Sequence, residues 1–162
     1  MGKNILEIYC DGACSGNPGE AGSGLAIYGS DENPTLLYGA YVEEGTNNVA
    51  ELNALLKALQ IAYANRDRYS QITIKSDSKY SIDSTTKWAY GWEKKGWQRK
   101  GGEIKNLELI QRTFKGYNLL KDRLNIEYVK GHAGEEGNEL ADKMARLAIE
   151  QRSGEYLTYQ EN

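Results

Sequence analysis

The order of strand-like and helix-like patterns is the feature that most restricts the fold of this chain. Apolar and polar residues alternate over residues 5–11, as in a half-buried strand, and residues 24–29 and 36–42 predict two further strands. The remaining pattern predicts a helix at 49–64, a strand at 72–75, helices at 78–85 and 107–119, a strand at 124–129 and a helix at 138–149. This order favours an α/β fold with a five-stranded mixed sheet, three antiparallel strands followed by two parallel ones, and helices on both faces.

Three local features complete this outline. The glycine-rich residues 12–24 predict turn material, because glycine and proline interrupt regular structure. Asn48 is the expected N-cap of the first long helix. The tail beyond residue 150 has no clear periodicity, and we expect a docked or frayed extension at 151–162.

Length and composition favour one cytoplasmic domain. The chain has 162 residues, of which 40% are hydrophobic, enough for a single core. The sequence contains no signal peptide pattern and no apolar stretch long enough to span a membrane, so we expect no membrane association. Cys10 and Cys14 are the only cysteines, and we expect both to be free thiols.

A basic, tryptophan-rich segment at residues 87–105, here called the handle, is the predicted nucleic-acid surface. The whole chain carries a net charge of −3, which disfavours indiscriminate binding to nucleic acid. The handle has six Lys and Arg residues against two Glu, a net charge of +4, with Trp88, Trp92 and Trp97 interleaved. Basic groups bind phosphates and aromatic rings pack on sugars or bases. The alternative is a solvated amphipathic helix anchored to the core by its tryptophans.

Four carboxylates stand where regular elements meet loops or polar faces. Asp11 and Asp77 each end a predicted strand, and ligands of open α/β sheets bind beyond the strand ends. Glu51 also has the spacing of a capping box with Asn48, and Asp142 also has the spacing of an ion pair with Arg146. The residues alone do not choose between metal binding and these structural roles.

Six sequence strings, taken together, resemble ribonuclease HI. They are DGACSGNPG, TNNVAEL, SDSKY, WxxxWxxxGW, EYVKGHAG and NELADxxA, in that order and with similar spacing from residue 5 to about 149. The resemblance implies a ribonuclease H-like fold, with a catalytic domain at residues 1–150. The chain starts close to its first strand, so we expect no separate N-terminal hybrid-binding module.

The resemblance also implies a reaction: hydrolysis of the RNA strand of an RNA/DNA hybrid, leaving 5′-phosphate and 3′-hydroxyl ends. It implies that two Mg²⁺ ions, with Mn²⁺ as a substitute, are bound by Asp11, Glu51, Asp77 and Asp142. Hard Mg²⁺ prefers such oxygen ligands, and two ions can activate the attacking water and stabilise the leaving oxygen. His132, in a glycine-flanked loop, is expected to assist proton transfer or product release.

The same resemblance assigns contacts to an RNA/DNA hybrid, which we expect to bind a monomer. The RNA side comprises Cys14, Asn17, Asn47 and Glu51, the DNA side Asn48 and Trp88, and a DNA phosphate pocket Thr46 and Asn106. Lys79 is a departure, because it stands near the RNA where family members often have an uncharged residue. The handle is expected to add contacts from Trp92, Lys94, Lys95, Trp97, Arg99 and Lys100. Glu44 departs from the family pattern, because family members commonly carry an arginine there. A carboxylate at that position would repel the phosphate.

Overall fold

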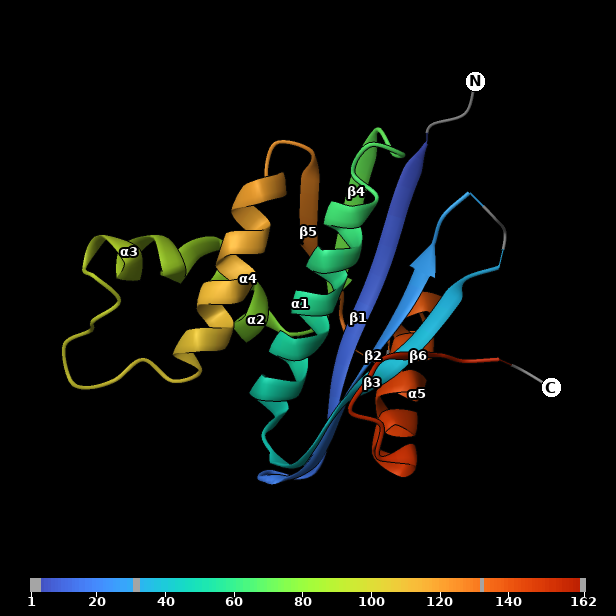
Figure 1. The fold of residues 1–162 in the computed structure, drawn as a ribbon, viewed down its shortest axis with the longest axis horizontal. Coiled ribbons are helices and arrows are strands. Elements are labelled where there is room, and N and C mark those ends of the chain that lie inside the picture. Colours follow the sequence, from blue (N-terminus) through green and yellow to red (C-terminus); the bar gives the residue numbers. More distant parts are fainter. Residues whose placement is uncertain (1–3, 31–32, 132, 161–162) are drawn as a thin grey trace.

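The computed structural model describes residues 4–30, 33–131 and 133–160, and its centre is a six-stranded mixed sheet with the order β5-β4-β1-β2-β3-β6 (Figure 1). The strands are β1 (Ile5–Gly16), β2 (Gly19–Tyr28), β3 (Thr35–Gly45), β4 (Gln71–Ser76), β5 (Leu124–Tyr128) and β6 (Leu157–Thr158). Strands β1, β2 and β3 are antiparallel, and β4 and β5 run parallel to β1. The predicted mixed sheet is confirmed, and the additional short strand comes from the tail.

Helices cover both faces of this sheet. They are α1 (Asn47–Ala64), α2 (Lys79–Asp83), the π-helical turn η1 (Ser84–Trp88), α3 (Ala89–Lys94), α4 (Leu107–Leu120) and α5 (Glu136–Gln151). Figure 1 shows α5 on one face, α1 on the other, α4 beside α1, and the α3 region extending away from the sheet. Among the helices in the described ranges, none is long and apolar enough to cross a membrane.

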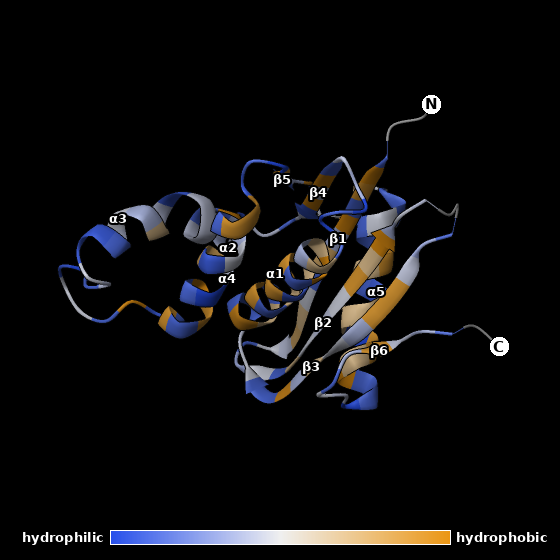
Figure 2. Cartoon of the chain, turned by 45° about the horizontal axis from the view of Figure 1, so that its top comes forward, coloured by the Kyte–Doolittle hydropathy of each residue, from blue (hydrophilic) through white to orange (hydrophobic). Residues whose placement is uncertain are grey.

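The main core lies between the sheet and α1. Leu6, Ile8 and Leu25 from the strands are at most 2% exposed and pack against buried residues of α1. The α1 side of this contact is built largely of alanine and leucine, and the hydropathy colouring of Figure 2 shows the apolar residues along the strands and this helix. Small side chains let the helix lie close to the strands, which brings the first turn of α1 up to β1.

Glycines in β1 and β2 explain why the predicted turn at 12–24 is wrong. These residues form the extended ends of two long strands, with a tight connection only between Gly16 and Gly19. A Cβ at Gly12 would lie 2.4 Å from the Ala50 carbonyl carbon, and a Cβ at Gly24 would lie 2.3 Å from the Ala145 nitrogen. The glycines therefore serve close packing of helices on the strands, not chain reversal.

The start of α1 also differs from the prediction. The N-cap is Thr46, whose Oγ1 accepts a hydrogen bond of 3.1 Å from the backbone nitrogen of Val49. Asn48 lies inside the first turn, so the expected Asn48 cap and its capping box with Glu51 are wrong. Threonine and asparagine both cap helices well. In the structure α1 begins directly after β3, which ends at Gly45, so Thr46 takes the cap position.

The tail is docked on the edge of the sheet. Leu157 pairs with Tyr38 of β3, and the Tyr41 nitrogen donates to the Ser153 carbonyl oxygen at 2.9 Å. Tyr156 packs against the main core and buries its ring there. The prediction of a docked or frayed extension is thus resolved in favour of docking, which covers an otherwise open strand edge.

Candidate metal-binding active site

The register of β1 and β4 places two carboxylates side by side. These strands are parallel neighbours, and their last paired residues are Cys10 and Ser76. Asp11 and Asp77 follow directly, each at the carboxyl end of its paired segment. β1 pairs in parallel with β4 on one side and antiparallel with β2 on the other. Ligands of open α/β sheets bind beyond the carboxyl ends of the strands, which is where these two carboxylates lie.

A third carboxylate reaches the same point from α1. The backbone nitrogen of Gly12 donates to Glu51 Oε1 at 2.5 Å and to Asp11 Oδ1 at 2.9 Å. The missing side chain of Gly12 permits this approach, since a Cβ there would also lie 2.4 Å from the Glu51 nitrogen. One peptide group therefore orients two acidic side chains from different elements.

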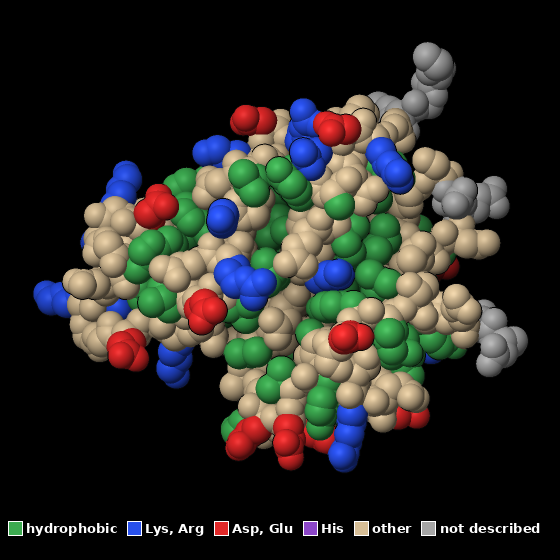
Figure 3. All heavy atoms as spheres, viewed as in Figure 1, with side chains coloured by type: hydrophobic (Ala, Val, Ile, Leu, Met, Phe, Trp, Pro, Cys, Tyr) green, Lys and Arg blue, Asp and Glu red, His purple; other side chains and the backbone are tan. Residues whose placement is uncertain are grey.

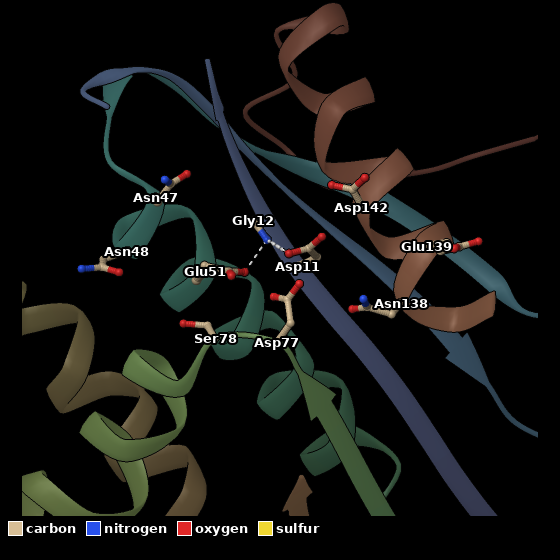
Figure 4. Close-up of a pocket in the computed structure, with 10 residues that line it drawn as sticks. All are labelled: Asp11, Gly12, Asn47, Asn48, Glu51, Asp77, Ser78, Asn138, Glu139 and Asp142. Atoms are coloured by element: carbon tan, nitrogen blue, oxygen red, sulfur yellow. Dashed lines mark hydrogen bonds between the residues drawn. The ribbon is translucent and has the colours of Figure 1, made fainter. Parts of the chain in front are cut away.

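Asp11, Glu51 and Asp77 form a compact acidic triad. One ligand oxygen from each lies within 4.8 Å of the others. The triad opens into a cavity of about 360 Å³, shown in Figure 4. The cavity is lined by Asp11, Gly12, Asn47, Asn48, Glu51, Asp77, Ser78, Asn138, Glu139 and Asp142.

Asp142 faces this cavity from α5 but lies outside the compact triad. Its Oδ2 accepts a salt bridge of 2.9 Å from Arg146 Nη2, so the expected helix-surface ion pair is present as well. Asp142 still contributes to the field of the site, because its charge is one cause of the raised pKa of Asp11. Asp142 thus lines the cavity and at the same time forms an ion pair with Arg146 on the helix surface.

The electrostatics of the triad favour a bound cation. Burial, followed by the charges of Asp77 and Asp142, raises the pKa of Asp11 to about 8. Burial and the charges of Asp11 and Asp77 raise the pKa of Glu51 well above its usual range. Clustered carboxylates of this kind resist ionising together, and a hard divalent cation with oxygen ligands removes that repulsion. The donor set therefore fits a divalent metal.

Four cavity residues were not among the predicted site residues: Gly12, Ser78, Asn138 and Glu139. Asn138 and Glu139 precede Asp142 by four and three positions on α5, which places all three on one side of the helix. Their helical spacing from Asp142 in the string NELAD was the available signal. His132, the predicted proton-transfer residue, lies outside the described residues.

The handle comprises the last two residues of η1, α3 and the loop that leads to α4. Trp88 is 44% exposed, whereas Trp92 and Trp97 are half-buried, and Trp97 packs on Phe114 with ring centroids 5.8 Å apart. The cations Lys94, Lys95, Arg99 and Lys100 are exposed. Figure 3 shows Lys and Arg side chains projecting from this end of the molecule. The handle is therefore anchored by two of its tryptophans and also presents an exposed basic surface.

A second, smaller cavity of about 220 Å³ lies between the handle and α1. It is lined by Asn48, Tyr80, Trp88, Trp92, Arg99, Ile104, Lys105 and Asn106. Asn106 Nδ2 donates to the Tyr80 hydroxyl at 3.0 Å. Thr46 is not one of the residues that line this cavity, and its hydroxyl caps α1. The phosphate pocket of Thr46 and Asn106 stays a prediction. Tyr80 and Lys105 were not singled out by the sequence analysis.

Asn47, predicted on the RNA side, and Asn48, predicted on the DNA side, are both exposed and line the acidic cavity. Asn17 Oδ1 accepts a hydrogen bond of 3.2 Å from the Asn47 backbone nitrogen. Cys14 is half-buried and is a free thiol, as predicted, with Sγ 3.5 Å from the Gly45 carbonyl oxygen.

Two charged residues of the predicted hybrid surface also have defined surroundings. Lys79 is exposed, with Nζ 5.0 Å from the centre of the Tyr128 ring. Glu44 is exposed and lines a separate surface hollow together with Glu20 and Glu43. That hollow is acidic, so a basic residue at position 44 would reduce its negative charge.

Comparison with known proteins gives a consistent result. The family model described as RNase H matches residues 3–150. A ribonuclease H of Acidovorax sp. (strain JS42) is 40% identical over 153 residues, covering 93% of this chain and 99% of that protein.

Solved structures agree with the sequence comparison. LC9-RNase H1, described as a type 1 RNase H with the type 2 active-site motif, has a TM-score of 0.78 at 26% identity, covering 98% of this chain and 79% of that chain. LC11-RNase H1, solved in complex with an RNA/DNA hybrid, has a TM-score of 0.62 at 25% identity, covering 91% of this chain and 98% of that chain. The predicted family is confirmed: this chain belongs to the RNase H family and is a nuclease of the type 1 ribonuclease H group.

Proposed function

We propose that this protein hydrolyses the RNA strand of RNA/DNA hybrids with two divalent metal ions, Mg²⁺ in the first place, and leaves 5′-phosphate and 3′-hydroxyl ends. The observation that carries the proposal is the acidic triad of Asp11, Glu51 and Asp77 at the sheet edge, next to Asp142. The hybrid-bound relative supports the substrate class. The catalytic unit is proposed to span residues 1–150, with residues 151–162 as a supporting tail.

Different residues of the site are proposed to have different roles. Asp11, Glu51, Asp77 and Asp142 would hold the metal, which supplies an activated water and stabilises charge on the leaving oxygen. Gly12 fixes the direction of the Asp11 and Glu51 carboxylates through its N–H group. Asn47 and Asn48 stand at the cavity entrance, where their amides are able to hydrogen-bond to the backbone or the 2′-hydroxyl of a nucleic acid.

The handle would bind the hybrid beside the active site. Its exposed cations are suited to phosphate binding and its exposed Trp88 to packing against a sugar or base. The small cavity with Arg99, Lys105 and Asn106 lies between the handle and α1 and is the proposed position for a phosphate of the DNA strand. His132 is proposed to assist proton transfer or product release.

A substrate panel tests this proposal. RNA/DNA hybrid, duplex RNA and duplex DNA, each end-labelled, are incubated with the protein at fixed salt with Mg²⁺, with Mn²⁺ or with EDTA, and the product ends are mapped. Cleavage of RNA in the hybrid alone, only with metal, is expected. Hybrid binding without cleavage would indicate a non-catalytic binding module, and cleavage of duplex DNA would indicate a different nuclease of the same superfold.

A further inference from the structure

Asn138 carries a buried polar atom whose partner is absent from the described part of the chain. Within residues 4–30, 33–131 and 133–160, two buried side-chain oxygens have no hydrogen-bond partner: Asn138 Oδ1 and Ser84 Oγ. Asn138 is only 4% exposed. Native proteins keep few such atoms, and each one calls for an explanation, often a bound ion, a water or a role at the active site.

The unpartnered oxygen lies at the acidic cavity. Asn138 lines it together with Asp11, Asp77 and Asp142, and Figure 4 shows its side chain directed from α5 toward Asp11 and Asp77. It precedes Asp142 by one helical turn, so both project from the same side of α5. By contrast, Ser84 lies in η1 and is not one of the residues that line this cavity.

The helix itself does not account for this side chain. Asn138 lies in the first turn of α5, where a polar side chain often reaches back to the N-cap backbone. The N-cap Glu135 makes no side-chain cap bond, and Asn138 Oδ1 accepts no hydrogen bond from the described residues. No Lys or Arg lines the described cavity either, so no protein cation is available to the amide oxygen there.

We propose that Asn138 is a further ligand group of the metal site and binds the hydrated divalent cation through its amide oxygen. The inference rests on the metal chemistry proposed above. Amide oxygens of asparagine are ordinary ligands of hard cations. A neutral donor adds a ligand without adding negative charge to a cluster in which burial, and then the neighbouring carboxylates, already raise the pKa of Asp11.

Metal binding to the substrate-free protein tests the proposal without relying on activity. Isothermal titration calorimetry with Mg²⁺ and with Mn²⁺ is performed on the wild type, Asn138→Leu, Asn138→Asp and the control Ser84→Ala. Asn138→Leu keeps the branched arrangement of heavy atoms but removes the polar atoms, and we expect about 10-fold weaker binding, as for other groups that support a metal site. Asn138→Asp should retain binding, and Ser84→Ala should bind as the wild type does.

Melting temperatures in EDTA separate a metal role from a structural one. If Asn138 Oδ1 serves the cation, Asn138→Leu should melt in EDTA at or above the wild-type temperature and should gain less from added metal. A lower melting temperature in EDTA with an unchanged metal affinity would show a structural role and overturn the inference. Equal metal affinity of the wild type and Asn138→Leu would overturn the inference about Asn138 but not the proposed function. Absence of metal binding by the wild type would overturn the proposed metal chemistry as well.

Discussion

The acidic cavity and the handle are built in opposite ways. In the cavity, strand register and a close helix approach fix the carboxylates, and Asp11 is only 5% exposed. In the handle, two half-buried tryptophans anchor a segment whose cations are exposed and held by few contacts. Bond hydrolysis requires fixed geometry, whereas phosphate binding tolerates movement because charge attraction is not directional. We therefore expect the two regions to control different quantities: the rate in the cavity and the affinity in the handle.

The largest expected effect is the loss of cleavage in Asp11→Asn. Asp11 is the carboxylate flanked by both Asp77 and Asp142, so replacing it should remove a metal-binding group from the centre of the site. We expect a rate at least about 1,000-fold lower, or about 4 kcal/mol in the activation barrier, measured by single-turnover cleavage. Hybrid binding in Ca²⁺ or without metal should largely persist. The exposed Asp122→Asn is the charge-matched control, and turnover by Asp11→Asn at the wild-type rate would remove Asp11 from the site.

Removing the handle cations should weaken binding by a smaller factor. The variant changes Lys94, Lys95, Arg99 and Lys100 to Ala. For every phosphate that the variant no longer neutralises, the slope of log K against log salt should become shallower by about 0.9. Hybrid affinity at low salt should therefore fall, and its salt dependence should flatten. Fluorescence anisotropy at several salt concentrations measures both quantities.

A second quadruple variant controls for net charge. It changes four cations outside the handle to Ala: Arg68, Arg112, Arg123 and Lys143. The slope of this control should stay close to that of the wild type. An unchanged slope in the handle variant would show that the handle is a solvated surface that does not bind phosphates.

The burial of Asp11 and the repulsion among the cavity carboxylates predict a stability effect in the opposite direction. The pKa of Asp11 is raised to about 8 in the folded protein, against about 3.9 for an unperturbed aspartate. A group with a raised folded-state pKa stabilises the fold at low pH, and this stability is lost as pH rises through the folded value. In EDTA the wild type should therefore lose stability between about pH 4 and pH 8. Asp11→Asn should be about 1 to 2 kcal/mol more stable than the wild type at pH 8, because it replaces a destabilising active-site carboxylate with a neutral amide.

Denaturant unfolding in EDTA at pH 5 and pH 8 measures this effect. The gain from Asp11→Asn should be larger at pH 8 and should disappear when saturating metal is added, because metal stabilises the wild type. Equal stability of the two proteins at both pH values would show that the carboxylates do not repel one another in the folded state.

The smallest expected effect is at Glu44, which belongs to neither region. Glu44 is exposed beside Glu20 and Glu43, so a guanidinium there would remove local repulsion of a phosphate. Glu44→Arg should tighten hybrid binding by about 1 kcal/mol at low salt, with a gain that shrinks at higher salt. Anisotropy titrations compare it with Glu44→Gln, which removes the charge only. No gain at low salt would mean that the hybrid passes this surface at a distance.

The same contrast explains what the sequence could predict. Local periodicity predicted the strands that carry Asp11 and Asp77, but their convergence depended on the two strands being neighbours, which the parallel pairing of β1 with β4 supplies. The role of Glu51 was left open between a cap and a ligand, because the contact with Gly12 depends on how closely α1 approaches β1. The capping residue Thr46 was missed for the same reason: tertiary packing selects among equivalent capping residues.

Other features depended on contacts that are distant in sequence. The glycines near residues 12 and 24 signal turns in a local pattern, yet they permit close helix packing in the fold. The strand β6 forms only because the tail meets the free edge of β3. The spacing of Asn138 from Asp142 was the one local signal for it, and its burial at the acidic cavity without a hydrogen-bond partner for Oδ1 became visible only in the fold.

One measurement tests the separation of rate from affinity most directly: single-turnover cleavage of labelled RNA/DNA hybrid in Mg²⁺, over a range of enzyme concentrations up to saturation. The wild type, Asp11→Asn and the handle variant are compared. The handle variant should require more enzyme for half-saturation but should reach the wild-type rate constant, whereas Asp11→Asn should saturate normally with a rate constant about 1,000-fold lower. A handle variant with a strongly reduced rate constant at saturation, or an Asp11→Asn protein that fails to saturate, would contradict this separation of roles.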